Sequence, residues 1–346
     1  MHDLHMGGLA KYALKRGGSL HPIIIPTSVL GNQTGIMNPS IFVNNGRIFM
    51  NVRHINYILY HSEGKKFPHQ WGPLVYVHPQ NDVTLTTYNV MCEFDSNFSL
   101  MSAGRINTSE FDTKPTWNFI GLEDARLFNW DDKLYICGVR RDCYDAKGTG
   151  RMEMAEIEFT GTEWKEVSRN PIPAPGDDSS YCEKNWMPIN DMPYHFVKWT
   201  NPTQVVHYDI KERKTTDVVL KTREEFYPLP KDLRGGSQVL KIGDDKWMAF
   251  CHETNLLRDV FTRKDGLYSH RVVIWDKDWN IIETSRSFHF LGTYFNHVTG
   301  EDFNIEFCTG AAFLGNDILI SFGLSDNCSY VLKMPQNVFF DFLARG

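Results

Sequence analysis

The sequence lacks the features that mark secreted, membrane-spanning or disordered chains. No apolar run is long enough to cross a membrane, and the opening stretch MHDLHMGGLAKYALKRGG has no apolar core of the kind that a secretory signal needs. Low-complexity tracts and blocks of like charge are also missing, while 42% of the residues are hydrophobic, as in folded proteins. We therefore expect a folded cytoplasmic protein.

Disulfide and metal signatures are missing as well. The seven cysteines make an odd number, none belongs to a CxxC pair, and most lie in apolar runs such as KLYICG and MAFCHE. Buried, reduced thiols explain this pattern better than disulfides or a zinc site. His252, His270 and His289 lack the spacing of metal ligands, and no serine or cysteine nucleophile stands out. We predict no metal and no cofactor.

Positive charge is scarce too. Lys and Arg number 36 against 42 Asp and Glu, so the net charge is −6. Proteins that bind nucleic acid depend on clustered Lys and Arg to neutralise phosphates. A general nucleic-acid surface is therefore not expected, although a local basic patch is compatible with this charge.

What remains is one large domain built from short strands. Helical periodicity is confined to Leu9–Leu14 and to the stretch 338–346, and the apolar runs between them are short and broken by Gly, Asn and Asp. Propellers and barrels of this length form single domains. We predict one all-β domain over residues 1–346, with an N-terminal cap segment of about residues 1–20 and a short C-terminal helix.

One hairpin pattern occurs five times. A polar cluster leads into a short strand, a turn follows, and a second apolar strand returns. The copies are MNPSIFVNNGRIFMNVRH from Met37, LEDARLFNWDDKLYICGVRR from Leu122, EKNWMPINDMPYHFVKW from Glu183, RGGSQVLKIGDDKWMAFCHE from Arg234 and EFCTGAAFLGNDILISFG from Glu306. A propeller blade has four antiparallel strands around a channel. The repeat predicts a five-bladed β-propeller whose inner strands are these hairpins.

Polar residues gather at one end of the predicted hairpins. The first strand of an antiparallel hairpin starts where the second strand ends, so both sets of residues share one rim. These residues are Asn38, Arg53, His54, Glu123, Asp124, Arg126, Arg140, Arg141, Glu183, Lys184, Asn185, Lys198, Trp199, Arg234, His252, Glu253 and Glu306. A repeated fold does not require charges at equivalent places. The pattern therefore predicts a site at the channel mouth.

Two clusters dominate this rim. In GLEDARLF, regular alternation turns Asp124 and Arg126 to one side and Glu123 to the other, and either an ion pair between blades or a sugar-binding carboxylate fits. In YCEKNWMPI, a carboxylate, an ammonium, an amide and an indole precede an apolar strand, as in sugar-binding sites. Trp186 taken alone indicates a core residue. We expect Glu183, Lys184 and Asn185 to share one cavity with the first cluster.

The RGGSQ segment at Arg234–Gln238 has paired glycines. Glycines remove side-chain obstruction and allow backbone to approach a ligand, and they also suit the turn that enters a strand. The segment lacks the spacing of a nucleotide-binding loop. Both readings remain open from the sequence.

On GLEDARLF and YCEKNWMPI the chain resembles the five-bladed propeller superfamily of β-1,2-mannoside phosphorylases, related glycoside hydrolases and mannosyltransferases. Its Glu-Asp-Pro-Arg motif is similar to the stretch 123–126 here, and two further strands are similar to GRMEMAEIEF at Arg151 and to Lys184-Asn185. The resemblance implies sugar inversion, with an Asp as proton donor and cationic groups that hold phosphate. In the matching stretch TTYNVMCEFD, the positions nearest to that donor hold Thr87, Tyr88 and Asn89, and Asp95 comes too late in the chain. This departure favours transfer from an activated donor, whose leaving group needs no acid.

The leading hypothesis is therefore an enzyme that transfers a glycosyl unit with inversion, as a glycosyltransferase or a phosphorylase-like enzyme. The alternatives are a glycoside hydrolase of the same fold and a non-catalytic glycan-binding propeller. A sugar or glycan is the expected substrate, with phosphate, a sugar phosphate or a nucleotide sugar as co-substrate, and a modified nucleic-acid acceptor is not favoured. Candidate catalytic residues are Glu123, Asp124, Glu183 and Glu306, and candidate binding residues are Asn38, Arg53, Arg126, Arg140, Arg151, Lys184, Asn185, Arg234 and His252.

Overall fold

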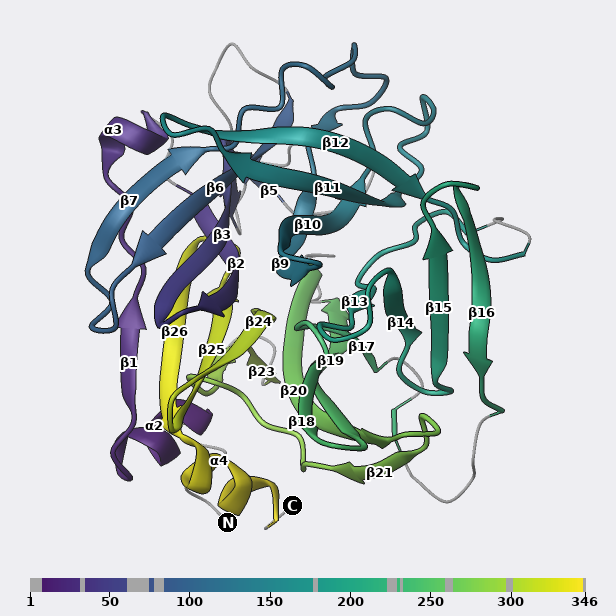
Figure 1. Cartoon of the computed structure of the whole chain (residues 1–346). Helices are drawn as coiled ribbons and strands as arrows, with labels where there is room; N and C mark the ends of the chain where they lie inside the picture. The colour runs from purple at the N-terminus through teal and green to yellow at the C-terminus, as the bar shows by residue number, and fades with distance from the viewer. Residues whose placement is uncertain are drawn as a thin grey trace.

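The protein is a five-bladed β-propeller, which confirms the predicted fold. The computed structural model describes residues 8–31, 35–60, 75–77, 84–176, 180–222, 229–230, 233–258, 264–296 and 301–344. Five antiparallel sheets surround one axis, and each uses strands that follow one another in sequence until the last blade (Figure 1).

The first three blades each contain four strands in chain order, from the axis outward. They are β2 (Gly35–Asn44), β3 (Arg47–Ile55), β6 (Leu85–Phe94) and β7 (Leu100–Arg105); β9 (Glu123–Trp130), β10 (Lys133–Arg140), β11 (Arg151–Phe159) and β12 (Trp164–Ile172); and β13 (Met187–Pro188), β14 (His195–Trp199), β15 (Gln204–Asp209) and β16 (Lys214–Leu220).

In the fourth blade two short strands occupy the inner position. The fifth blade includes β1, a strand from near the N-terminus, as its outer strand. The strands are β17 (Arg234–Gly235), β18 (Leu240–Gly243), β19 (Lys246–Arg258), β20 (Lys264–Asp276) and β21 (Ile281–Thr284); and β24 (Glu306–Leu314), β25 (Asp317–Leu324), β26 (Cys328–Pro335) and β1 (Ser19–Pro22). Since β1 pairs with β26, joining of the two chain ends closes the ring.

Smaller elements decorate the blades. They are β4 (Ile58–Tyr60) paired with β5 (Val75–Val77), β8 (Phe119–Ile120) beside β6, β22 (Tyr294–Asn296) paired with β23 (Glu301–Phe303), and the helices α2 (Gly8–Leu14), α3 (Thr27–Leu30) and α4 (Gln336–Leu343). Helix α2 lies inside the predicted N-terminal segment, and α4 lies at the predicted C-terminal position. Both helices pack in one apolar cluster with blades four and five. Among the described residues, no helix is long and apolar enough to span a membrane.

All five predicted hairpins are the inner strands of the five blades. Local turn chemistry explains several of them, because Asn45-Gly46 and Asp131-Asp132 occupy left-handed conformations at both central positions. Two such residues in a two-residue turn match the twist of a hairpin. The innermost strands are buried on both faces, as the seven consecutive buried residues at the start of β2 and of β24 show.

The side chain of Gln238 fastens the inner strands together at the axis. Its amide nitrogen donates to the Ser40 hydroxyl (3.1 Å), to the Ile41 carbonyl (3.0 Å) and to the Leu127 carbonyl. Its amide oxygen accepts from the Ala311 backbone nitrogen (3.2 Å). Strands of blades one, two and five are thus bound to a residue of blade four, so the axis is filled by polar protein groups at this level.

Replacing Gln238 by Met keeps much of the side-chain volume and removes these hydrogen bonds. We expect the free energy of unfolding to fall by about 3 kcal/mol or more, since each buried backbone group left without a partner costs about 1–3 kcal/mol. Urea denaturation measures this change. Gln204→Met is the matched control, because Gln204 bonds only Asp217 on exposed outer strands, and its expected loss is below about 1 kcal/mol. Equal losses in the two variants would contradict the role given to Gln238.

Candidate functional site

The heads of three neighbouring inner strands contain residues in the left-handed conformation. Asn38, Asp124 and Asn185 have φ values of 46°, 51° and 63°. Asn and Asp tolerate this conformation better than other residues with a side chain. In blade two it forms a β-bulge, since Glu123 pairs with Val139 but Arg126 pairs with Cys137. Regular alternation therefore fails at this point, and the predicted separation of Glu123 from Asp124 is wrong.

Both carboxylates instead approach Arg53, which lies near the end of β3 in blade one. Its guanidinium nitrogens lie 2.8 Å from Asp124 Oδ1 and 3.4 Å from Glu123 Oε2. The same guanidinium donates to the Tyr57 hydroxyl (2.7 Å) and to the Thr87 hydroxyl (3.1 Å). Only 5% of Arg53 is exposed, so its charge is buried. Four polar partners, namely Asp124, Glu123, Tyr57 and Thr87, hold the guanidinium in place.

The two carboxylates have opposite pKa shifts. Burial by itself would raise the pKa of Asp124, but Arg53, the Asn38 amide at 2.7 Å and Arg126 outweigh burial and hold this pKa below its ordinary value. Burial raises the pKa of Glu123 above its ordinary value; Arg53 opposes the shift and the Asp124 charge adds to it. Glu123 Oε1 has no hydrogen-bond partner among the described residues. Glu123 is thus the carboxylate with a buried oxygen that the described residues leave without a donor.

Arg126 braces three blades and is almost fully buried. Its Nε donates to the Gly236 carbonyl (2.8 Å), and its terminal nitrogens donate to the Asp124 carbonyl (2.8 Å) and to Asn185 Oδ1 (3.3 Å). Burial lowers its pKa, although Asp124 opposes the shift. The ion pair between blades that GLEDARLF allows is made by Asp124 with Arg53 of blade one. Neutral oxygens occupy the Arg126 guanidinium, which the sequence predicts to bind substrate.

Cationic side chains lie on the other side of Glu123. Lys184, which is exposed, and Arg141 both lower the pKa of Glu123 electrostatically. Lys184 and Arg234 also act on His252, whose pKa burial lowers to about 3 with the help of nearby Arg126. His252 is therefore neutral at physiological pH, and its Nδ1 has no hydrogen-bond partner in the described part of the chain. This side of the site is suited to an anionic group.

The structure assigns two candidate carboxylates to other contacts. Glu183 accepts from the Trp186 indole (3.0 Å) and pairs with Lys198 (3.2 Å), so of the expected trio Lys184 and Asn185 reach the first cluster but Glu183 turns to the core. Glu306 is fully buried and accepts from the backbone nitrogens of Phe290 (2.6 Å) and Leu291 (2.7 Å). These are structural contacts.

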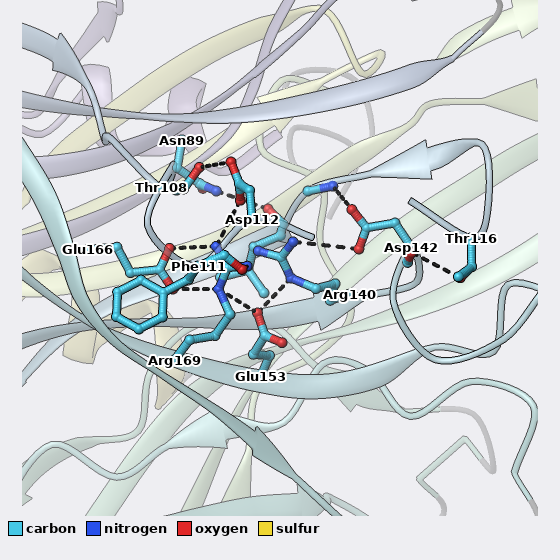
Figure 2. A network of polar contacts seen from close by, with 12 residues as sticks. Asn89, Thr108, Phe111, Asp112, Thr116, Arg140, Asp142, Glu153, Glu166 and Arg169 are labelled. Carbon is cyan, nitrogen blue, oxygen red and sulfur yellow. Dashed lines mark hydrogen bonds and ion pairs between the residues drawn. The ribbon is translucent and has the colours of Figure 1, made fainter. Parts of the chain in front are cut away.

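Two candidate arginines also lie outside this cluster. Arg140 pairs with Glu153 (2.6 Å) and Asp142 (3.5 Å) in a buried ionic network between blades one and two (Figure 2). Arg151 donates to the backbone carbonyls of Gly150 (2.9 Å) and Ser180 (2.8 Å).

The glycines of RGGSQ pack against protein. A Cβ at Gly235 would lie 2.1 Å from the Asn185 carbonyl, and one at Gly236 would lie 2.3 Å from the Phe250 carbonyl. The glycines therefore let neighbouring inner strands approach each other, which supports the strand-entry reading. Sequence reasoning also missed Tyr57, whose only signal is its position four residues after Arg53.

The sequence matches no protein-family model and no curated protein sequence. Solved structures share the fold. A β-1,2-mannobiose phosphorylase from Listeria innocua is 13% identical and covers 95% of this chain and 100% of its own, with a TM-score of 0.54. A glycosyl hydrolase from Bacteroides ovatus is 11% identical and covers 97% of this chain and 92% of its own, with a TM-score of 0.57.

A third structure comes from the GH130 family of mannoside phosphorylases, which contains glycoside hydrolases that target β-1,2-mannosidic linkages in Candida mannan. It is 12% identical and covers 88% of this chain and 85% of its own, with a TM-score of 0.58. At such identities the likeness shows a shared fold. It confirms the resemblance that GLEDARLF and YCEKNWMPI suggested.

The environment of Glu306 predicts a pH-dependent stability. Burial raises its pKa from 4.5 to about 7, although the backbone N–H of Leu291, the Asn304 amide and the N–H of Phe290 oppose the shift. The folded state therefore binds the proton more tightly than the unfolded state, so stability is highest below pH 4.5 and falls as the pH rises towards 7. A shift of this size corresponds to about 3 kcal/mol.

Glu306→Gln should remove this part of the pH dependence between about pH 4.5 and 7, whatever it does to stability at any single pH. Urea denaturation across this range measures the slope for both proteins. Gln204→Met is the control, because it removes no titratable group and its slope should therefore match that of the unmodified protein. An unchanged slope in Glu306→Gln would show that Glu306 titrates at its ordinary pKa.

Proposed function

We propose that this protein is a carbohydrate-active enzyme that transfers a glycosyl unit with inversion at the channel mouth. One observation carries the proposal: Glu123 and Asp124 are adjacent, yet their surroundings shift their pKa values in opposite directions. Pairs of carboxylates with separated pKa values are typical of sites that combine a proton-transferring group with a permanently ionised one.

Glu123 is suited to the proton transfer. Its Oε1 has no partner among the described residues, and its raised pKa makes it a stronger base than an ordinary carboxylate. The acceptor hydroxyl loses its proton to Glu123 while its oxygen attacks the anomeric carbon from the face opposite the leaving group. The bond from the anomeric carbon to the donor oxygen breaks, and the leaving group departs with the electron pair.

Asp124 supplies the fixed negative charge. Arg53 and Asn38 hold its carboxylate, and its low pKa keeps it ionised as the anomeric carbon becomes positively charged. A charge that is positioned before the reaction stabilises the transition state without reorganisation. Arg53 thus acts as a positioning residue for Asp124.

A phosphate-bearing donor fits the cationic side of the site. Lys184, Arg141 and Arg234 lie near enough to shift the pKa values of Glu123 or His252. Cationic groups stabilise a departing phosphate, which needs no proton from an acid. The stretch 87–89, which lacks an acid, supports the same reading. Because neighbours of the same fold act on β-1,2-mannosides, mannose 1-phosphate and nucleotide-activated mannose are the first donors to assay.

Lys184→Met should leave folding nearly unchanged and lower turnover of a phosphate-bearing donor by about 100-fold, as removal of one electrostatic group from such sites does. Lys184 is exposed, so thermal unfolding should shift little. Lys241→Met, at an exposed pair with Asp191 on β18, is the control and should retain full turnover. If the melting temperature of Lys184→Met collapses, Lys184 is a structural brace.

Glu123→Gln should reduce turnover by about 10²–10⁴-fold while donor binding is preserved. In the unmodified protein kcat/KM should fall as the pH drops through a pKa above 4.5, because the base must be deprotonated; the variant should lose this limb. Product analysis by chromatography separates the outcomes. Donor hydrolysis without transfer would identify a hydrolase, and absence of any turnover across sugar phosphates and nucleotide sugars would identify a glycan-binding propeller.

A further inference from the structure

A second cavity lies between the first two blades. Its volume is about 200 Å³, which is the space of roughly six or seven water molecules at about 30 Å³ each and is comparable to one pyranose ring with its hydroxyls. It is lined by strand β6, by the segment between β7 and β8, and by parts of blade two. The mechanism proposed above does not use it.

The cations beside this cavity are already engaged. Arg169 bonds Glu166 through two nitrogens (2.6 and 2.7 Å), and it also bonds the Phe111 carbonyl (2.7 Å) and Asp112 (3.1 Å) (Figure 2). Arg140 is balanced by Glu153 at 2.6 Å. Two guanidinium groups thus face four carboxylates, counting Asp142. An anionic ligand would meet surplus negative charge here.

Asp142 supplies the observation that points to a ligand. Its side chain is 6% exposed, and its Oδ2 accepts from the Gly121 backbone nitrogen at 2.9 Å. Its Oδ1 has no hydrogen-bond partner among the described residues, and the nearest cation, Arg140, lies 3.5 Å away. A buried carboxylate oxygen without a donor is costly. Asp142 lines the cavity with this oxygen buried, so a turn of its side chain would bring the unpaired acceptor to an O–H or N–H group of a ligand there.

The rest of the lining matches an uncharged, hydroxyl-rich molecule. Thr113 contributes a hydroxyl that can donate or accept, and Ile136 and Leu122 contribute an apolar wall. The Thr108 hydroxyl donates to Asp112 (2.9 Å) and can still accept, and the Thr86 hydroxyl shares one hydrogen bond with Thr84 (2.9 Å). Sugar rings present hydroxyls at the edge and C–H groups on the face, so a wall of this kind suits them. We propose that this inter-blade cavity is a second ligand site, which binds an uncharged polyhydroxylated molecule the size of one monosaccharide.

The cavity and the channel mouth are separate but adjoining. The Thr87 hydroxyl accepts from Arg53 at the mouth, and the same residue lines the cavity. Gly121 lines the cavity two residues before Glu123. Occupancy of the cavity does not depend on turnover at Glu123, so the binding test below is independent of the proposed function.

The test is calorimetric titration of the full chain with a methyl hexopyranoside, which is uncharged and carries no phosphate. Asp142→Asn should weaken binding by about tenfold or more, because an amide N–H₂ replaces one of the two acceptor oxygens. Thr113→Phe, at an exposed position of the lining, should block the cavity without disturbing the core. Lys241→Met, at an exposed ion pair of β18, is the control and should bind within about twofold of the unmodified protein.

Three results would overturn the proposal. The first is no hexopyranoside binding to the unmodified protein at millimolar concentrations. The second is binding that Lys184→Met abolishes and Asp142→Asn and Thr113→Phe leave intact, which would place the sugar at the channel mouth. The third is binding of methylammonium, and not of the sugar, with the same dependence on Asp142, which would make the cavity a cation site.

Discussion

The whole propeller depends on the hydrogen bonds that residues 238 and 239 make at its axis. The Gln238 amide binds strands of blades one, two and five, and the backbone of Val239 exchanges hydrogen bonds with Pro188 and Asn190 in blade three. One dipeptide of blade four thus contacts every other blade. Because an unpaired backbone group at this depth is costly, the polar contacts fix the spacing of the inner strands as well as their register.

This spacing also explains the backbone distortions at the channel mouth. Inner strands held so closely leave little room for side chains, and Gly310 of blade five is required because a Cβ there would lie 2.4 Å from the Ile41 backbone nitrogen of blade one. The bulge at Asp124 turns two consecutive carboxylates towards one guanidinium. Residues in sparsely populated conformations persist where the surrounding structure determines them fully, and such places are typical of functional sites. Here Arg53 binds the carboxylate of Asp124 and Arg126 binds its backbone carbonyl, and together they hold Asp124 in its left-handed conformation.

The sequence predicted those features of the structure that short stretches of the chain determine by themselves. Turn residues and apolar strands recur in each hairpin, so the five blades and their order could be predicted. The bulge could not, because it follows from contacts between blades, and regular alternation therefore separated Glu123 from Asp124. The partners of Glu183 and Glu306 could not be predicted either. An indole N–H bonds Glu183 and two backbone N–H groups bond Glu306, and these groups meet only after the chain has folded. In a sequence, a carboxylate that binds a ligand cannot be distinguished from one that makes buried structural contacts.

The distribution of charge around Glu123 gives the proposed chemistry a direction. On one side the cations Lys184 and Arg234 are close enough to depress the pKa of His252. On the other side, beyond Thr87 and Gly121, the inter-blade cavity has carboxylates in excess over guanidinium groups that are already paired. In the proposed reaction, the cations would attract the phosphate of a donor to the channel mouth, and the carboxylates would disfavour it in the cavity. Since electrostatic complementarity selects among ligands more strongly than it adds affinity, a phosphate-bearing donor would then lie with its charged end towards Lys184 and leave Glu123 facing the acceptor.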